Sequence, residues 1–484
     1  MNYRMIKYTL GWIMIFEAGF MLVPLITAAV YLEIQFLHFL AVALLSLGLG
    51  ALLVLKKPSN TTLYAKEGFV IASLSWITLS VIGALPFIFT GVITSPIDAL
   101  FEAVSGFTTT GSSIFTAVEW LPKSILMWRS FMHWVGGMGV LVFMMAFLPL
   151  AGGQNMHIMK AESPGPEIAK IVPRVKKTAL ILYAIYFVLT LISFILYLVA
   201  DMSWFEALNT AFATAGTGGF GFRDDSFASM SATQQWLVTA FMLIFSINFN
   251  SYYLILKLKL RDAFNSEVKA FVLFVIAAIA IISFSICREM EAIGQFDSIA
   301  DGVRHAAFSL AAVISTTGFA TVDFDIWPTL AKGVLLLALF VGACAGSTGG
   351  GVKVSRILIL LKGLRNEIRK LIHPRQVKSI TIDRKAVDNE VVRSVNSYLV
   401  AYFCIFMVSV MLVSIEGKDL ITTVTSVMTT IGNVGPGLSL VGPTANFAHM
   451  SDLSKVVLIF DMLAGRLELF PMLILFSPET WKKS

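Results

Sequence analysis

Four short segments of this 484-residue chain combine threonine with glycine, and each precedes an apolar stretch. They read TTTGSS, ATAGTGGFG, STTGFAT and TTIGNVGPG, at 108–113, 213–221, 315–321 and 429–437. Glycine permits backbone angles that turn successive carbonyl groups to one side, and threonine hydroxyls can add oxygen ligands. Oxygen ligands suit a hard monovalent cation, and none of the four segments contains His or Cys. The pattern predicts four loops that meet on one axis, where carbonyl groups replace the water shell of a cation.

Loops one, three and four each align on one glycine, whereas the second loop is irregular. In loop two we favour Gly219, because the Gly-Phe pair that begins there repeats the pair at Gly318; Gly216 and Gly218 remain alternatives. The predicted ion-binding residues are the aligned glycines and their neighbours, namely Thr110, Gly111, Ser112, Gly218, Gly219, Phe220, Thr317, Gly318, Ile431, Gly432 and Asn433.

A glycine-rich segment interrupts an apolar stretch that is too long for one membrane crossing. The stretch 327–361 has 35 residues, or about 52 Å if it were one helix. Four glycines within six residues would unwind a helix, and broken helices at mid-membrane often line a transport path. We predict a flexible gate beneath the loops, the alternative being a packing kink between close helices. The predicted gate comprises Gly346, Ser347, Thr348, Gly349, Gly350 and Gly351.

A single arginine, Arg466, stands within the last apolar stretch, in the sequence DMLAGRLELF. A charge at that depth is costly unless it faces the protein interior or a water-filled cavity. The nearby acids Asp461 and Glu468 do not share its helix face. We therefore expect Arg466 to contact the carbonyl groups of the glycine-rich segment or water in the pore, as part of the gate. The alternative is a structural arginine in a polar network.

The composition identifies the elements that position these residues as membrane-spanning helices. Hydrophobic residues make up 57% of the chain and charged residues only 14%, whereas soluble proteins carry about 25% charged residues. Apolar stretches of about 20 residues are long enough to cross the hydrocarbon core. Ten spans are expected, at 8–31, 35–55, 68–92, 124–150, 178–200, 233–256, 268–287, 329–361, 395–415 and 453–476.

The order of these spans predicts an all-α membrane protein with an internal repeat. Two N-terminal helices precede four units, each consisting of a helix, a short amphipathic helix, a Thr/Gly loop and a second helix. Such loops are tolerated at membrane depth only when they line a cavity or are buried in protein. The expected divisions are a two-helix domain at 1–67, pore unit one at 68–150, pore unit two with its linker at 151–260, pore unit three with the gate at 261–363, and a linker with pore unit four at 364–484.

The charges predict which side of the lipid bilayer each connection faces. If both termini are cytoplasmic and the four loops face outward, 27 of the 36 lysines and arginines lie on the cytoplasmic side, as the positive-inside rule expects. The net charge of +6 therefore reports topology and not nucleic-acid binding. Many acidic residues fall on the outer side, where they form either an acidic mouth that concentrates cations or an ordinary solvated face.

The combination of fourfold loops, two extra N-terminal helices, GSTGGGVK and the late arginine closely resembles the TrkH family. Its members are the membrane subunits of bacterial Trk potassium-uptake systems, in the Trk/Ktr/HKT superfamily. The resemblance implies a pseudo-fourfold, potassium-channel-like pore in the bacterial inner membrane, with K⁺ as the transported ion. It also implies a homodimer that associates with a cytosolic, nucleotide-binding TrkA-like ring. It places at the filter Gly111, Gly219, Gly318 and Gly432.

Three functions are open at this point. The first is potassium uptake through a gated pore, and the second is K⁺ symport coupled to H⁺ or Na⁺, for which only Asp461 and Glu468 suggest a second ion site. The third, a membrane enzyme, is disfavoured because the six histidines are scattered and lack metal-ligand spacing. The chain has no dinucleotide fingerprint, so we expect it to bind no nucleotide itself, and any nucleotide effect would come through its partner.

Overall fold

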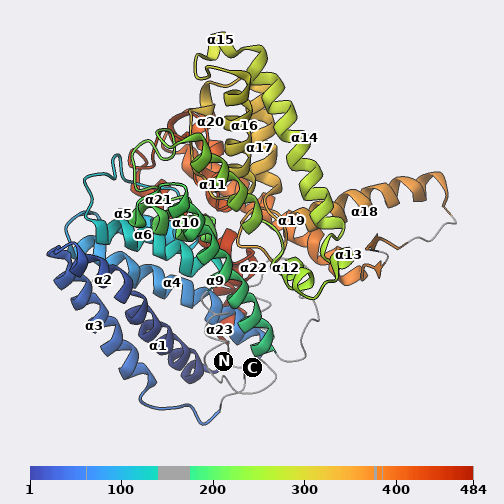
Figure 1. Cartoon of the computed structure of the whole chain (residues 1–484). Coiled ribbons are helices and arrows are strands. Elements are labelled where there is room, and N and C mark those ends of the chain that lie inside the picture. Colours follow the sequence, from blue (N-terminus) through green and yellow to red (C-terminus); the bar gives the residue numbers. More distant parts are fainter. Residues whose placement is uncertain (61–62, 140–174, 375–378, 384, 483–484) are drawn as a thin grey trace.

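The computed structural model describes residues 1–60, 63–139, 175–374, 379–383 and 385–482. Within these ranges the chain is almost entirely helical (Figure 1), as the composition predicts. The N-terminal part contains α1 (Tyr3–Phe20), α2 (Leu22–Val30) and α3 (Gln35–Val54). Gly11 of α1 and Gly50 of α3 face each other so closely that neither position has room for a Cβ. Small residues let these two helices pack backbone against backbone.

Four groups of helices follow, and in each group one helix leads into a Thr/Gly loop, with a helix before it and at least one helix after the loop. Unit one holds α4 (Ala65–Phe89), α5 (Pro96–Phe107) and α6 (Lys123–Gly137). Unit two holds α9 (Val175–Val199), α10 (Trp204–Gly216), α11 (Ala232–Phe245) and α12 (Phe249–Leu256). Unit three holds α14 (Ser266–Arg288), α15 (Met290–Ile293), α16 (Ile299–Ile314), α17 (Thr329–Val341) and α18 (Val354–Ile372). Unit four holds α19 (Asn389–Ser414), α20 (Leu420–Ile431), α21 (Asp452–Arg466) and α22 (Phe470–Phe476).

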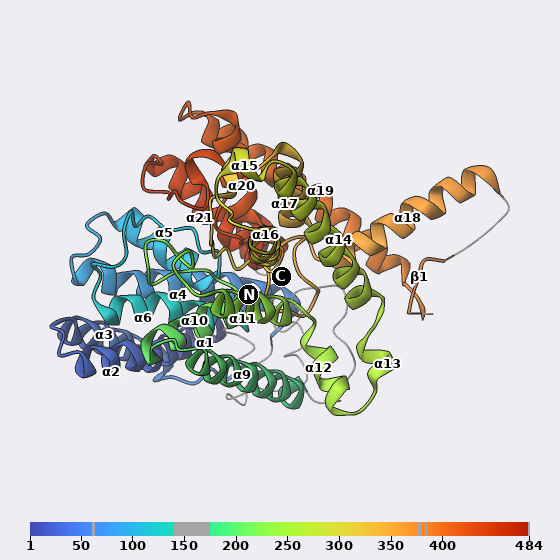
Figure 2. The same ribbon diagram turned by 45° about the horizontal axis from the view of Figure 1, so that its top comes forward.

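The remaining elements are short and connect these units. They are α13 (Leu260–Ala263), α23 (Pro478–Trp481), the 3₁₀ turns η1 (Phe324–Ile326) and η2 (Ser439–Val441), and the antiparallel pair β1 (Thr381–Ile382) and β2 (Lys385–Ala386). Helix α18 projects away from the helical body in both views (Figures 1 and 2). Its exposed flank carries both apolar and basic side chains.

The four short helices that precede the loops start in the same way. Each begins at a residue whose side-chain oxygen accepts a hydrogen bond from a backbone N–H of the first turn, which stabilises the helix start. These capping residues are Ser95, Ser203, Ser298 and Asp419. The C-terminal ends of the helices are buried and lead directly into the Thr/Gly loops. The carbonyl ends of the helix dipoles are thus directed at the loops, where they favour a cation.

The helices that follow the loops are less continuous than the sequence predicts. The described residues contain six helices that are long and apolar enough to cross a membrane, if α1 and α2 are counted together, or seven if α11 and α12, bent by 90°, form one span. The spans expected at 233–256 and 453–476 are each divided into two helices. Asn248 caps a new helix after the first break, and Glu468 and Leu469 have positive φ angles at the second. The last part of the expected span 124–150 lies outside the described residues.

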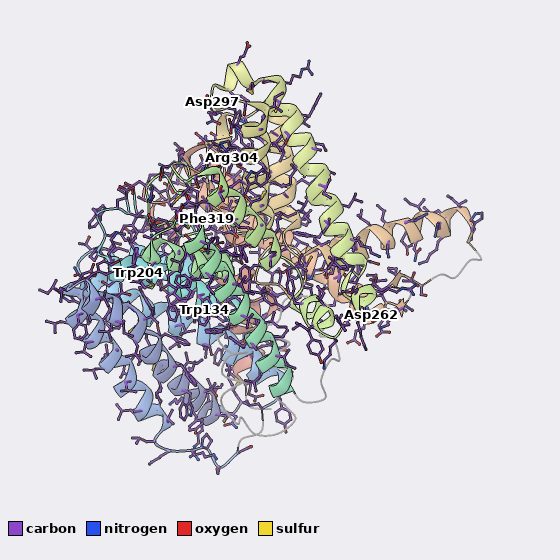
Figure 3. All side chains as sticks on the ribbon, in the orientation of Figure 1. Trp134, Trp204, Asp262, Asp297, Arg304 and Phe319 are labelled. Carbon is purple, nitrogen blue, oxygen red and sulfur yellow. The ribbon has the colours of Figure 1, made fainter. Side chains whose placement is uncertain are left out.

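Both termini lie at the same end of the molecule (Figure 1). The hydroxyl of Tyr3 donates to the carbonyl of Trp481 at 3.1 Å, and Lys66 donates to the carbonyl of Glu479 at 2.9 Å. Asp297, from a connection expected to face outward, lies far from Asp262, from one expected to be cytoplasmic (Figure 3). Which of these ends faces the cytoplasm stays a prediction from the charges.

Candidate functional site: a ring of four loops and the segment beneath it

The four Thr/Gly loops share one backbone conformation. Each contains a non-glycine residue with a left-handed backbone, at φ of 57°, 55°, 60° and 53° for Thr109, Thr217, Thr316 and Asn433. Two residues later each has a glycine with positive φ, at 81°, 83°, 81° and 100° for Gly111, Gly219, Gly318 and Gly435. Left-handed non-glycine residues are uncommon, so four copies at the same spacing mark four equivalent loops.

The fourth loop differs from the expected alignment. Gly432 has φ of −82° and ends α20, with its N–H bonded to the carbonyl of Met428. Gly435, three residues further on, has the positive φ angle of Gly111, Gly219 and Gly318. We call these four residues the ring glycines. The alignment of TTIG with TTTG was misleading because α20 extends through Ile431, so that the loop begins later in the sequence. In loop two, Gly219 takes the ring position that we favoured.

The loops close into a ring in the order of the chain. At each ring glycine, a Cβ would overlap the carbonyl oxygen of the residue that precedes the ring glycine in the next loop. The pairs are Gly111 with Gly218, Gly219 with Thr317, Gly318 with Val434, and Gly435 with Thr110. The fourth contact returns to the first loop, so the four carbonyl groups form a closed circuit. Only glycine can occupy such crowded, left-handed positions at low cost.

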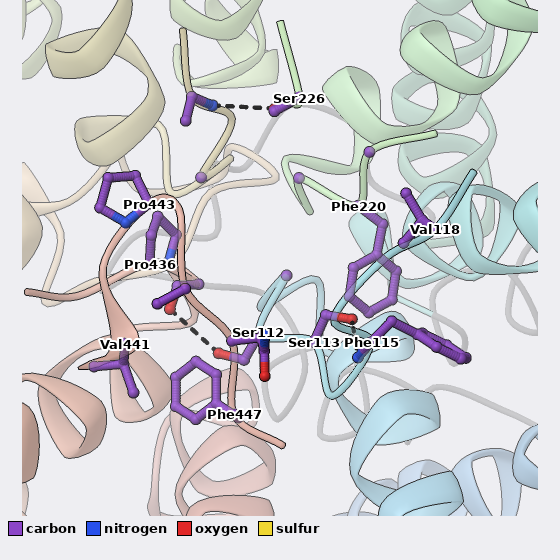
Figure 4. A pocket seen from close by; sticks show the side chains of 18 of the residues that line it. Ser112, Ser113, Phe115, Val118, Phe220, Ser226, Pro436, Val441, Pro443 and Phe447 are labelled. Carbon is purple, nitrogen blue, oxygen red and sulfur yellow. Dashed lines mark hydrogen bonds between the residues drawn. The ribbon is translucent and has the colours of Figure 1, made fainter. Parts of the chain in front are cut away.

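A cavity of about 130 Å³ lies at the ring and is lined by residues from all four loops (Figure 4). Ser112 reaches from the first loop to the fourth, donating from its hydroxyl to the carbonyl of Gly435 at 3.3 Å. Ala320 of the third loop donates its N–H to the hydroxyl of Ser226, which follows the second loop, at 3.2 Å. Hydrogen bonds therefore join neighbouring loops around the mouth of the ring.

A buried ion pair braces the first two loops from behind. Nε of Arg129 lies 2.8 Å from a carboxylate oxygen of Glu102, and the two side chains are 2% and 0% exposed. Glu102 also accepts from the hydroxyl of Ser113 and the N–H of Ile114. Arg129 donates to the carbonyl of Gly221 at 3.1 Å. The pair thus links α5 and α6 to loops one and two.

His133, also on α6, lies between the same two loops. Its Nδ1 is 2.7 Å from the carbonyl oxygen of Gly106, and its Nε2 is 3.1 Å from the backbone nitrogen of Phe220. The sequence reasoning singled out neither His133 nor Arg129. The only available signal was a pair of polar side chains, four residues apart, within a predicted apolar span.

The glycine-rich segment forms the break between α17 and α18 and lies directly against loops three and four. The N–H of Gly350 donates to the hydroxyl of Thr316 at 2.6 Å, and that of Gly351 donates to the carbonyl of Gly432 at 2.9 Å. On the other side, the carbonyl of Gly346 accepts from the N–H of Phe249 at 2.9 Å, at the start of α12. The segment therefore bridges the ring and the bend between α11 and α12.

Arg466 lies at the end of α21 and contacts this segment. Its guanidinium donates to the carbonyl of Thr348 at 2.9 Å, to that of Gly137 at 2.8 Å, and to that of Gly136. We expected Arg466 to contact either carbonyl groups of the glycine-rich segment or water in the pore, and the contact with a carbonyl group of this segment is present. Arg466 thus ties the segment to the end of α6.

Other charged side chains occupy the same region. Glu468 pairs with Arg356 of α18, whose guanidinium also lies 3.9 Å from the ring centre of Tyr398. The ammonium of the buried Lys353 donates to the carbonyl of Gly349. In the part of the chain that the structure describes, no three His, Cys, Asp or Glu side chains come together as a metal site.

Acidic residues at the outer ends of the helices have structural roles. Hydrogen bonds from Thr422 hold the pKa of Asp419 below its usual range, and a bond from Ser298 does the same to the pKa of Asp301. Asp419 is the N-cap of α20, and Asp301 is in the first turn of α16. Asp224 instead lines the cavity at the ring. Of these three acids, Asp419 and Asp301 thus stabilise helix starts, and Asp224 lies at the ring.

Comparisons with known proteins agree with this architecture. Residues 34–483 match the model of the TrkH family, described as cation transport proteins. The Trk system potassium uptake proteins TrkH of Halomonas elongata and Escherichia coli K12 are each 34% identical to this chain, with complete coverage of both sequences. The crystal structure of the potassium transporter TrkH from Vibrio parahaemolyticus superimposes with a TM-score of 0.88 at 31% identity, also over both complete chains.

Proposed function

The chain belongs to the TrkH family of cation transport proteins, and we propose that its four loops form the selectivity filter of a gated potassium pore. It is a multi-pass helical membrane protein for potassium uptake and not an enzyme. The observation that carries the proposal is the closed circuit of ring glycines against carbonyl groups from all four loops. Carbonyl oxygens arranged in this way can replace the hydration shell of K⁺.

The proposed ion ligands follow from the observed register. They are the backbone carbonyl groups of Thr110, Gly218, Thr317 and Val434, with those of the adjacent ring glycines. Val434 and Gly435 replace Ile431 and Gly432 in the set expected from the sequence. Asn433 holds the loop in place, since its amide donates to the hydroxyl of Thr110 and to the carbonyl of Met462, both at 2.9 Å.

The segment 346–351 and Arg466 form the proposed gate. The segment lies against the ring, and Arg466 adds a positive charge that would repel a cation leaving the filter. Glycines let the segment change its backbone conformation at low cost. Displacement of the segment, together with Arg466, would open the path to the cytoplasm.

Opening is proposed to be driven through α18, which continues from the gate and projects from the body. Four of its basic residues offer a docking surface for a cytosolic, nucleotide-binding ring of the TrkA kind, namely Lys362, Arg365, Arg369 and Lys370. We further propose a homodimer in the inner membrane, with both termini cytoplasmic. Nucleotide control would come from the ring, because this chain carries no dinucleotide fingerprint.

Coupled K⁺ symport is the second candidate, and one observation favours it. Asp461 is fully buried in α21, where one carboxylate oxygen accepts from Ser409 at 2.7 Å and the other has no hydrogen-bond partner. A buried carboxyl group of this kind can take up and release a proton or a small cation. Flux in liposomes, with and without a pH gradient, separates this candidate from a pore.

The fourth loop supplies a sharp test of the filter. Gly435→Ala would place a Cβ against the carbonyl of Thr110 at a φ of 100°, whereas Gly432→Ala adds a Cβ at a normal helical φ. Purified protein in liposomes should take up K⁺ in preference to Na⁺. We expect Gly435→Ala to reduce that preference about tenfold or more, and Gly432→Ala to change it much less. Equal effects of the two substitutions would contradict the proposed register.

A further inference from the structure

The second loop departs from the other three at one position, between its left-handed Thr217 and its ring glycine. Loops one, three and four have Thr110, Thr317 and Val434 there, whereas loop two has Gly218. The backbone of Gly218 does not require glycine, since its φ is not positive. Something other than backbone strain must therefore account for the missing side chain.

The side chains at this position support the loops from behind. The hydroxyl of Thr110 lies 2.8 Å from that of Thr108 and accepts from the amide of Asn433 at 2.9 Å. The hydroxyl of Thr317 lies 2.7 Å from that of Ser315. In loops one and three, therefore, the polar side chain of the middle residue connects the loop to its own helix end. Gly218 cannot make such a contact.

The imidazole of His133 fills the space that this side chain would occupy. A Cβ on Gly218 would overlap Cγ, Nδ1 and Cδ2 of the ring. The ring is fully buried and lies 4.3 Å, centre to centre, from the ring of Phe220. His133 comes from α6 of the preceding unit. Unit one thus provides loop two with the supporting side chain that loops one and three provide for themselves.

The hydrogen bonds of His133 define its protonation. The carbonyl of Gly106 can only accept, so Nδ1 carries the proton and donates to it at 2.7 Å. In the neutral ring Nε2 is then an acceptor, and it receives the N–H of Phe220 at 3.1 Å. The ring therefore fixes both the last turn of α5 and the residue that follows ring glycine Gly219.

We propose that His133 is the positioning residue of the second filter loop, acting across the unit boundary in place of a side chain at Gly218. By holding the N–H of Phe220 it sets the orientation of the peptide groups at Gly218 and Gly219, and hence the direction of their carbonyl oxygens. This inference rests on the proposed function, because it assigns His133 to potassium selectivity. His133 itself does not touch the ion.

The test compares variants of His133 that keep or remove its hydrogen bonds, in liposomes loaded for K⁺ and Na⁺ flux. His133→Phe retains a ring but loses both bonds, and should lower the K⁺ to Na⁺ flux ratio about fivefold. His133→Gln retains one donor and one acceptor and should recover most of the ratio. Trp134→Phe is the control on the same helix as His133, since it removes a single 3.2 Å bond to Thr190 of α9 and should leave the ratio unchanged.

A second pair of variants tests the same contact from the loop. Gly218→Ala places a Cβ on the imidazole and should lower the flux ratio, while adding His133→Ala removes the overlap and should restore part of it. This pair also decides the question if His133→Phe does not fold. A folded His133→Phe protein with the parent ratio, or a double variant no better than Gly218→Ala, would overturn the role of His133. A parent protein that does not distinguish K⁺ from Na⁺ would overturn the proposed function, and this inference with it.

Discussion

Two arginines, the buried Arg129 behind the ring and the partly buried Arg466 beneath it, are held in different ways. Arg129 pairs with a carboxylate, that of Glu102, at 2.8 Å and also donates to Ser113 and Gly221. Arg466 donates to backbone carbonyl groups, at Thr348 and at the end of α6. The first arrangement joins opposite charges in the interior, whereas the second joins a charge to neutral groups on a glycine-rich segment.

The difference indicates which part of the molecule can move. A buried charge pair is costly to separate, because each partner would be left unpaired in a medium of low dielectric constant. Carbonyl groups of a flexible segment can be exchanged for water or for other carbonyl groups at much lower cost. Arg129 should therefore act as a permanent brace of loops one and two, and Arg466 as a releasable contact beneath loops three and four. Opposite effects of substitution are expected.

The largest expected effect is on stability, at Arg129. Arg129→Met leaves the carboxylate of Glu102 buried without its partner, which costs about 3–5 kcal/mol in comparable sites. Thermal unfolding of the protein in detergent should show a large drop in Tm, and surviving protein should have lost its preference for K⁺.

The sequence Phe-Glu-Ala, which contains Glu102 at 101–103, occurs again at 205–207 and provides a matched control for this prediction. Its Glu206 pairs with Arg223 at 2.6 Å, but these side chains are 22% and 35% exposed. Burial raises the pKa of Glu206, yet hydrogen bonds from Arg223 and Ser203 outweigh it and hold the pKa below its usual range. Because exposed pairs contribute about 0–1 kcal/mol, Arg223→Gln should change Tm little. If Arg129→Met and Arg223→Gln lowered Tm by similar amounts, the buried pair would stabilise the protein no more than the exposed pair.

The same triplet shows what the sequence can and cannot predict. Its two copies do not hold equivalent positions, since Glu102 lies nine residues before its ring glycine and Glu206 thirteen. Local signals predicted the four loops, the short helices before them and the break at Gly346–Gly351. Partners distant in the chain were not predictable, because the contact of His133 with Phe220 exists only once the units pack. The predicted register of loop four was wrong because the length of α20 also depends on that packing.

The next effect concerns flux and has the opposite sign. Arg466→Ala removes a positive charge beneath the ring and three hydrogen bonds to carbonyl groups, so K⁺ flux in liposomes should rise, by about tenfold if the charge contributes 1.4 kcal/mol to the barrier. Arg466→Lys keeps the charge but not the forked geometry. If the K⁺ flux of the lysine variant equals that of the parent, the positive charge blocks the path. If its flux rises as in the alanine variant, the hydrogen bonds are responsible. A folded alanine variant that conducts no faster than the parent would contradict the releasable contact.

The smallest effect is expected where α18 contacts the short connection between α21 and α22, which follows Arg466. Arg356 of α18 pairs with Glu468, and both Glu468 and Leu469 have positive φ angles, at 58° and 67°. Such backbone conformations persist only where surrounding contacts hold them, so the pair should keep the end of α21, and with it Arg466, in the closed position. Glu468 is 19% exposed, and the contribution of the pair is therefore smaller than that of the brace. We expect Glu468→Gln to raise basal K⁺ flux about twofold to threefold.

Arg356→Gln should have the same effect, and the double variant should equal either single variant, because all three remove one shared interaction. Lys370→Gln is the control on the same helix, since its pair with Glu367 is exposed and distant from the gate. If the effects of Arg356→Gln and Glu468→Gln simply multiply in the double variant, the two residues act independently on flux. In that case α18 does not transmit movement to Arg466 through this pair, and the gate must be coupled to the cytoplasmic side through the segment 346–351 alone.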